Sequence, residues 1–508
     1  MKKKQFLRNI CILTAGSIAL RLIGIGFSGW LSRKIGAEGM GLFQLVFSVY
    51  SLASTIATSG IYLAVTRLVA EELGKGNERR AAGAMRVCMI YGVVVSALAS
   101  GLLWFGAPFI GTKILGDSRT ILSMKVLAAA LPFMAFSCSL RGYFFAIREV
   151  WKTNSSQILE QLIRIAVVAA AFQVVLPKGL EWACVGIALG SVGGEALTFW
   201  YTFVLYLRDR RKRMKNAGKG KGEKVARDVL SIAVPVALSS YLKSALVTLE
   251  NILIPAGFRK YGADTTQALA QYGMMEAMVM PVLSFPAALI TSFSSLLVPE
   301  VAEWRATGRE SEIDRLTEQT LRGTFLFSLP VATAFILFGE QLGSSIYGNA
   351  EAGRMLWVMA PLTPILYLDI VADALLKGMD QQLSVLRYSI IDSSLSVLLL
   401  YTLLPVFGLQ GYITVLFFTS FVNAALSISR LTAVTRIHFK MWDWIGRPLT
   451  AAGIAGIICY FASANWTFSP VLQCIFGIGM LAAIYLASLG ITAPQKLLRH
   501  KTEPARQS

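Results

Sequence analysis

The chain has 508 residues, of which 55% are hydrophobic and only 15% are charged. A soluble domain carries about 25% charged residues, so this chain has too little polar surface to fold in water and belongs to the membrane class. Its formal net charge is +19. Basic loops between membrane helices orient a protein and meet anionic lipids, so we expect those lipids, and no nucleic acid, as partners.

Apolar segments follow one another along the chain, and each approaches the roughly 20 residues that span a bilayer. The first follows Lys2, Lys3 and Lys4 and is too long for the apolar part of a cleaved signal peptide. We therefore predict an all-α integral membrane protein with fourteen transmembrane helices. The predicted spans are residues 6–31, 41–68, 82–106, 121–147, 155–176, 182–207, 229–255, 268–298, 321–338, 353–377, 382–405, 410–436, 447–464 and 469–490.

Two copies of one unit follow each other in the sequence, because several matches recur in order at nearly one offset. Each copy holds six predicted spans, an even number, so the copies run in the same direction. We expect two six-helix lobes related by a pseudo-two-fold axis along the membrane normal, plus two extra C-terminal helices. The matches are Pro132 with Pro364, Glu160 with Asp392, Glu71 with Glu303 and Gly76 with Gly308 at an offset of 232, and Arg33 with Arg259 at an offset of 226.

The repeat and the loop charges divide the chain into five parts. These are an N-lobe at 1–207, a basic cytoplasmic linker at 208–227, a C-lobe at 228–440, two further spans at 441–495 and a cytoplasmic tail at 496–508. Lysine and arginine gather in the loops on one side, which places both termini in the cytoplasm of a multi-pass cell-membrane protein. The charged segment 300–320 has apolar residues at helical spacing, which predicts a surface helix between two spans.

The sequence lacks the residues that metal sites, disulfides and common catalytic sets require. The six cysteines all lie in apolar segments and form no Cys-x-x-Cys pair, so we expect neither a metal site nor disulfides. Only His438 and His500 are present, and no Ser-His-Asp or Cys-His set can be assembled. We expect no enzyme, no cofactor and a monomer.

Charged residues inside the predicted spans are informative, because a charge in hydrocarbon costs several kcal/mol and usually faces a partner or a wet cavity. Glu160 and Arg164 are four residues apart and can pair on one helix face, as can Asp369, Asp373 and Lys377. Such pairs can simply brace helix packing, but a hydrated cavity better explains charges in both lobes. The charges are Arg21, Arg141, Glu160, Arg164 and Glu195 in the first copy and Lys243, Glu250, Glu276, Asp369, Asp373, Arg387 and Asp392 in the second.

Two cations stand at related positions. The offset of 226 places Lys243 at the position of Ser17, one helical turn from Arg21. If these helices face each other, the cations converge and can hold a phosphate, Arg21 with a planar fork and Lys243 as a point charge. We predict a substrate site of Arg21, Lys243, Arg164 and Arg141. A buried carboxylate can exchange a proton or Na⁺ during a transport cycle, and the coupling candidates are Glu160, Asp373 and Asp392.

Five stretches together resemble the multidrug/oligosaccharidyl-lipid/polysaccharide flippase superfamily. The resemblance is to the branch that contains stage V sporulation protein B, a relative of the lipid II flippase. The lipid II flippase has an Arg-Asp pair where this chain has Phe27 and Ser28, so the resemblance does not single out lipid II as the substrate. The stretches are Ser59–Glu71, Arg141–Phe144, Gln157–Arg164, Leu376–Gln382 and Ile390–Ser393.

The resemblance implies two lobes around a central cavity that opens alternately to each side. A lipid-linked sugar for polysaccharide, peptidoglycan or spore-cortex synthesis would cross with its pyrophosphate held by cavity cations. Two alternatives stay open. One is a cation-coupled multidrug exporter of the same superfamily, and the other is a non-transporting membrane scaffold for envelope or spore assembly.

The loop charges generate a test of orientation. A cysteine introduced by Gly218→Cys should react with a membrane-impermeant thiol reagent only from the cytoplasmic side, because it lies in the basic linker. Labelling from outside intact cells would overturn the predicted orientation.

Overall fold

The computed structural model describes residues 2–213, 223–437, 439–464 and 466–491, and every regular element in these ranges is helical. Ten helices are long and apolar enough to cross a membrane, or up to twelve if each of two bent pairs counts as one span. The chain is thus a multi-pass all-α membrane protein. The tail at 496–508 lies outside the described residues, as does the middle of the linker, where α7 runs to Arg213 and α8 starts at Glu223.

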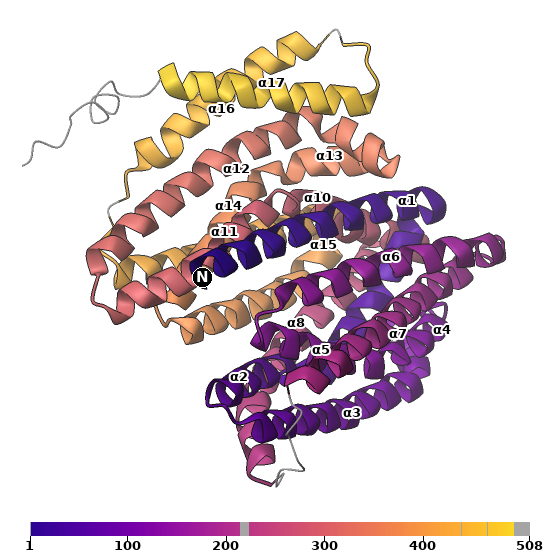
Figure 1. Cartoon of the computed structure of the whole chain (residues 1–508). Helices are drawn as coiled ribbons and strands as arrows, with labels where there is room; N and C mark the ends of the chain where they lie inside the picture. The colour runs from indigo at the N-terminus through magenta and orange to yellow at the C-terminus, as the bar shows by residue number, and fades with distance from the viewer. Residues whose placement is uncertain (1, 214–222, 438, 465, 492–508) are drawn as a thin grey trace, which may run out of the picture. The chain divides into compact units, whose positions relative to one another are not determined.

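The chain groups into two compact units, and the first comprises residues 1–277 and 393–415. In Figure 1 its first range runs from indigo to magenta, and residues 393–415 are orange. The helices of the first unit are α1 (Lys2–Thr58), α2 (Ile61–Gly74), α3 (Glu78–Phe109), the π-helix η1 (Ile110–Leu115), α4 (Thr120–Ala128), α5 (Ala130–Ala146), α6 (Val150–Val175), the short η2 (Leu176–Lys178), α7 (Leu180–Arg213), α8 (Glu223–Tyr261), α9 (Thr265–Tyr272), most of the π-helix η3 (Gly273–Val279) and the middle of α15 (Gln382–Val434).

The second unit comprises residues 278–392 and 416–508. The two helices that follow the predicted repeat, α16 (Arg447–Ser463) and α17 (Pro470–Ile491), pack against each other and along α12 (Glu310–Tyr347) (Figure 1). The helices of the second unit are α10 (Met280–Ser284), α11 (Ala287–Ala306), α12 (Glu310–Tyr347), α13 (Ala350–Met359), η4 (Ala360–Leu362), α14 (Thr363–Gly378), the outer parts of α15 (Gln382–Val434), η5 (Trp442–Gly446), α16 (Arg447–Ser463) and α17 (Pro470–Ile491).

Two of the long helices are broken by a glycine. Helix α1 breaks at Gly36, with φ 68° and ψ −177°, and α15 breaks at Gly408, with φ 55° and ψ −132°. Both angle pairs lie outside the helical region and are open to glycine because it lacks a Cβ. The breaks fall between predicted spans, at 31–41 and 405–410. The exact number of fourteen spans, the lobe boundaries and the pseudo-symmetry stay predictions.

The predicted repeat recurs in the turns. Arg148 and Asp380 are non-glycine residues with φ near +60°, a conformation that few such residues adopt. They are 232 residues apart, as are two further pairs of turn residues, and a fourth pair is 226 apart. The pairs and their φ angles are Arg148 (62°) with Asp380 (61°), Gly76 (72°) with Gly308 (71°), Gly116 (68°) with Gly348 (69°), and Gly36 (68°) with Gly262 (117°).

The prediction of a separate surface helix at 300–320 is wrong. Helix α11 continues to Ala306, the chain turns at Gly308, and α12 begins at Glu310. The apolar residues of this segment fit the end of one long helix and the start of the next as well as they fit a separate helix. Ile313 and Thr317 are buried against the unit rather than lying on a surface helix.

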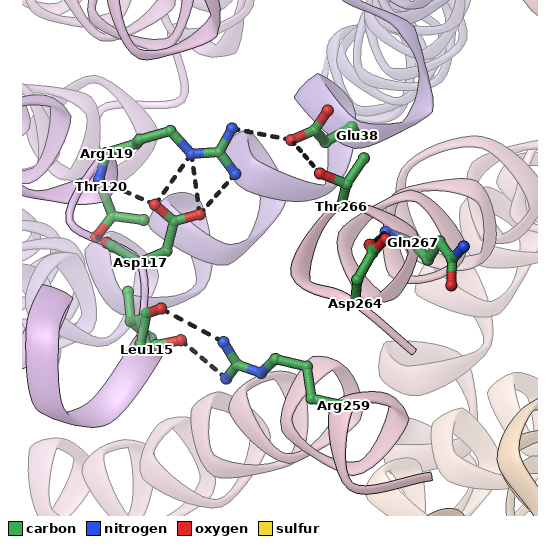
Figure 2. Close-up of polar contacts among 10 residues, drawn as sticks. Glu38, Leu115, Asp117, Arg119, Thr120, Arg259, Asp264, Thr266 and Gln267 are labelled. Atoms are coloured by element: carbon green, nitrogen blue, oxygen red, sulfur yellow. Dashed lines mark hydrogen bonds and ion pairs between the residues drawn. The ribbon is translucent and has the colours of Figure 1, made fainter. Parts of the chain in front are cut away.

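A polar cluster ties helix ends together within the first unit, and Figure 2 shows its contacts. Arg119, between η1 and α4, pairs with Asp117 at 2.8 Å and with Glu38 of α1 at 2.9 Å. Glu38 also accepts from Thr266 Oγ1 of α9. Arg259 of α8 donates to the carbonyl oxygens of Leu115, at 3.0 Å, and Gly116. We call this the helix-end cluster; it joins α8 to the end of η1, and α9 to α1.

The other end of α8 is held more loosely. Arg80 of α3 pairs with Asp228 of α8 at 2.9 Å and lies 3.6 Å from Glu72 of α2. Both side chains of the Arg80–Asp228 pair are more than 40% exposed, and exposed ion pairs contribute about 0–1 kcal/mol. Helix α8 is therefore bonded at both ends to other helices of the first unit, and the bonding is firmer at the helix-end cluster.

Helices α1 and α9 cross at two glycines. A Cβ built on Gly41 would lie 1.9 Å from the carbonyl oxygen of Leu269, and one built on Gly273 would lie 2.3 Å from the carbonyl oxygen of Ala37. Close helix crossings in membranes depend on such small residues.

The crossing predicts that Gly41→Ala destabilises the protein. The new methyl group would meet backbone rather than a movable side chain, and such overpacking typically costs about 1–3 kcal/mol. Thermal unfolding of the purified protein should start at a lower temperature. Gly101→Ala is the matched control, because its Cβ would meet nothing within 4 Å; equal unfolding temperatures for the two variants would contradict the prediction.

The helix-end cluster makes a second prediction. Hydrogen bonding to the Asp117 carboxylate raises the pKa of Arg119 above its ordinary value, so the guanidinium keeps its charge. Arg119→Ala leaves Asp117, which is 8% exposed, without that cation and should lower the free energy of unfolding by about 1–3 kcal/mol. The control is Lys113→Ala on the preceding turn, where the side chain is exposed. A variant as stable as its control would show that the cluster does not hold these helices.

Candidate functional site

Four charged side chains lie within electrostatic reach of one another inside the membrane-spanning part of the first unit. Arg141 comes from α5, Glu160 and Arg164 from α6, and Glu195 from α7. Arg141 Nη1 lies 3.3 Å from Glu160 Oε2, and Arg164 Nη2 lies 2.6 Å from Glu160 Oε1. Each oxygen of Glu160 thus accepts one arginine. We call these four residues the intramembrane charge cluster.

Local sequence explains how the cluster forms. Glu160 and Arg164 are one turn apart on α6, so their pairing follows from helical spacing, and the predicted pair is confirmed. Helix α7 approaches α6 closely at Gly190 and Gly194, where an added Cβ would lie 2.9 Å from the carbonyl oxygen of Arg164 and 3.0 Å from that of Glu160. Glu195 follows Gly194 directly and is therefore carried to the cluster.

The charged side chains of this cluster are largely buried, so their contacts affect stability. The side chains of Arg141 and Glu160 are 13% and 14% exposed, and Glu195 is 4% exposed. A buried charge without a partner is strongly destabilising, and here each arginine meets a carboxylate. Arg164 Nε is buried without a hydrogen-bond acceptor, so the guanidinium keeps a donor for a further anion.

Glu195 was named as a membrane charge in the sequence but was not predicted as a site residue. A sequence signal could have found it, because Gly186, Gly190 and Gly194 recur every fourth residue and such spacing indicates a helix face that packs closely on another. The contact of Arg141 with Glu160 joins two helices, and no spacing within one helix predicts it.

A second group of charges lies in the second unit. Asp369 on α14 accepts from Asn423 at 2.9 Å and from Ser427 at 3.4 Å. Asp373, one turn on, pairs with Lys377 at 3.3 Å, as the spacing predicts. Asp392 on α15 lies within electrostatic reach of Asp369. This acidic group therefore contains two of the three predicted coupling residues, Asp373 and Asp392.

A further buried carboxylate lies in the first unit at a π-helix, which often marks a functional site. Glu276 on η3 accepts a hydrogen bond from Tyr412 of α15. Nearby, Tyr272 donates to Asn251 of α8 at 2.7 Å. Among the residues that the structure describes, no group of three or more His, Cys, Asp or Glu side chains is arranged to hold a metal ion.

The two repeat-related cations lie on different stretches of helix. Arg21 is half-buried in the part of α1 before Gly36 and interacts with at least one other group. Lys243 is exposed on α8, and its neighbour Ser244 bonds to Thr55 in the later part of α1. The contacts bring Arg141 and Arg164 together on Glu160, while the convergence of Arg21 and Lys243 stays a prediction.

Comparisons with known proteins agree with this architecture. A family model described as "Polysaccharide biosynthesis protein" matches residues 6–305. The chain is 26% identical over 502 residues to stage V sporulation protein B of Bacillus subtilis (strain 168), with 96% of each chain covered. It is 23% identical over 406 residues to the lipid II flippase MurJ of the same organism, covering 74% of this chain and 73% of that one.

Solved structures share the fold. A structure of the lipid II flippase MurJ in an inward closed conformation has a TM-score of 0.73 at 11% sequence identity, covering 96% of this chain and all of that one. An inward-facing multidrug resistance transporter of the MATE family has a TM-score of 0.60 at 16% identity, covering 82% of this chain and 94% of that one. With its family model matching more than half of its length, the chain belongs to the polysaccharide biosynthesis protein family, within the multidrug/oligosaccharidyl-lipid/polysaccharide flippase superfamily.

Proposed function

We propose that this protein moves a lipid-linked oligosaccharide across the membrane by alternating access. Its relatives include a lipid II flippase and a sporulation protein, which supports a precursor of the cell envelope or spore cortex as cargo. The observation that carries the proposal is the convergence of Arg141 and Arg164 on one carboxylate inside the membrane.

The pyrophosphate of such a lipid is the anion that this arrangement suits. Two guanidinium groups at one point can bind phosphate oxygens through charge-assisted hydrogen bonds. When no substrate is bound, Glu160 satisfies both arginines, so the empty site does not leave cations buried without a partner. Substrate loading then exchanges the Glu160 carboxylate for a phosphate oxygen, and the lipid tail stays in the bilayer.

Arg21 and Lys243 extend this site in the proposal. Each is a cation within a membrane-spanning helix, and a charge there is costly unless it has a function or a partner. We assign them to the same anion, with Arg21 as a fork and Lys243 as a point charge. Glu160, Asp373 and Asp392 are proposed to couple transport to protons or Na⁺.

A cation-coupled multidrug exporter is the second candidate, and the acidic group around Asp369 favours it. Carboxylates that outnumber the cations near them suit a cationic drug better than a phosphate, whereas the arginines of the first unit suit a phosphate. Mass spectrometry of lipids that co-purify with the protein separates the two. A lipid-linked sugar or polyprenyl pyrophosphate supports the flippase, and its absence together with drug-dependent transport supports the exporter.

The flippase makes a prediction for the arginines. Arg164→Ala should weaken binding of a polyprenyl pyrophosphate by about ten-fold to a hundred-fold, because a charge-assisted phosphate contact is typically worth about 1.5–3 kcal/mol. Arg164→Lys should restore binding only in part, because the planar fork is lost. Binding can be measured with full-length protein in nanodiscs.

Arg21→Ala and Lys243→Ala should lose flipping while still reaching the membrane. The control is Arg354→Ala, whose side chain is 70% exposed and 3.9 Å from Glu340, and which should behave as wild type. If Arg164→Ala, Arg21→Ala and Lys243→Ala all bind and flip normally, the anion site lies elsewhere. A scaffold without transport would tolerate all of these changes.

A further inference from the structure

A cavity of about 140 Å³ opens within the second unit, between the turn that joins α11 to α12 and the end of α15. Arg305 lies in the last turn of α11, and Arg436 lies just beyond the end of α15. Glu310 and Asp314 lie near the start of α12. All four side chains line this cavity and stand apart from the acidic group around Asp369. The cavity is therefore a separate place at which charged groups converge.

The walls of the cavity belong to ordered elements. Asp314 Oδ1 accepts a hydrogen bond from the backbone N–H of Arg436 at 3.0 Å, which ties α12 to the end of α15. Ile313, which is 2% exposed, and the half-buried Val434 line the cavity from below and pack in the apolar core of the unit. The cavity thus exists before any ligand enters, as is usual for binding sites with a few convergent polar groups.

The charged side chains around the cavity leave most of their hydrogen-bonding capacity unused. Among the residues that the structure describes, no side-chain hydrogen bond or ion pair involves Arg305, Glu310 or Arg436, and all three are exposed. The guanidinium groups can donate and the carboxylates can accept. Two cations and two carboxylates sum to zero, which suits a ligand that carries both charges better than it suits a simple anion.

The chain beyond Arg436 indicates the depth of the cavity in the membrane. Met441 and Trp442 are 64% and 68% exposed and follow the exposed Lys440, while Trp444 is 3% exposed and fixes the segment to the apolar core of the unit. Exposed tryptophan beside lysine is typical of the interface between lipid and water. The cavity therefore lies beside the lipid head groups, which are those of the cytoplasmic leaflet in the predicted orientation.

We propose that this cavity binds the head group of phosphatidylethanolamine. Arg305 and Arg436 donate charge-assisted hydrogen bonds to the phosphodiester, Glu310 accepts from the ammonium group, and the acyl chains stay in the bilayer. Phosphatidylcholine carries the same two charges, but its trimethylammonium group has no N–H to donate. Phosphatidylglycerol lacks the cation. The site is independent of the proposed cargo, because it binds a lipid of the surrounding membrane.

The test measures binding of dioctanoyl phosphatidylethanolamine to full-length protein in detergent, freed of co-purified lipid, by native mass spectrometry. Wild-type protein should bind this lipid about ten-fold more tightly than dioctanoyl phosphatidylcholine or phosphatidylglycerol, as expected for one charge-assisted hydrogen bond. Arg305→Ala and Arg436→Ala should each weaken binding by about ten-fold. Both should fold normally, because neither side chain bonds to the rest of the described chain. Arg315→Ala is the matched control, since this exposed arginine of α12 lies outside the cavity lining.

Glu310→Gln tests the contact with the ammonium group. It should lower the affinity for phosphatidylethanolamine to that for the other two lipids, whereas Glu312→Gln, at an exposed acid of the same turn, should keep the preference. Equal binding of the three lipids by wild type, or a preference retained in Glu310→Gln, would overturn the head-group assignment.

Unchanged affinity in both arginine variants would overturn the site itself. Displacement of the lipid by inorganic phosphate would identify a site for free anions and would overturn the assignment to a lipid. The assay contains no lipid-linked sugar, so each of these results would leave the proposed flippase function as it stands.

Discussion

The arrangement of the first unit depends on one carboxylate. Glu160 accepts an arginine on each of its oxygens, and Glu195 lies within electrostatic reach of it. Three helices, α5, α6 and α7, supply these side chains. Inside a membrane each of the four charges is costly alone, so these helices must keep their register for the cluster to survive. Helix packing and electrostatics constrain each other here.

Glycine sets how close those helices come. The spacing of Gly186, Gly190 and Gly194 opens one face of α7 to α6, and the crossing of α1 with α9 at Gly41 and Gly273 does the same elsewhere. In hydrocarbon, apolar side chains gain little by turning from lipid to another helix, so close backbone contact supplies much of the attraction. The intramembrane charge cluster can form because α7 lies close enough to α6 to bring Glu195 near Glu160 and Arg164.

Sequence reasoning succeeded where the signal is local. Apolar length identified the membrane helices, the glycine breaks in α1 and α15 fall between predicted spans, and helical spacing identified the Glu160–Arg164 and Asp373–Lys377 pairs. It failed at residues 300–320, because charge and helical spacing do not distinguish a surface helix from two long helices that meet at Gly308. Glu195 was missed as a site residue because its partners come from other helices.

The membership of α8 in the first unit bears on how such proteins can be recombined. By sequence, α8 begins the second copy of the repeat, yet it is bonded to α3 through Arg80 and to the end of η1 through Arg259. A chimera joined at the repeat boundary, between two relatives, would therefore replace one side of both contacts and leave mismatched partners. A crossover after residue 277, with residues 393–415 taken from the same parent, would keep each network within one parental sequence.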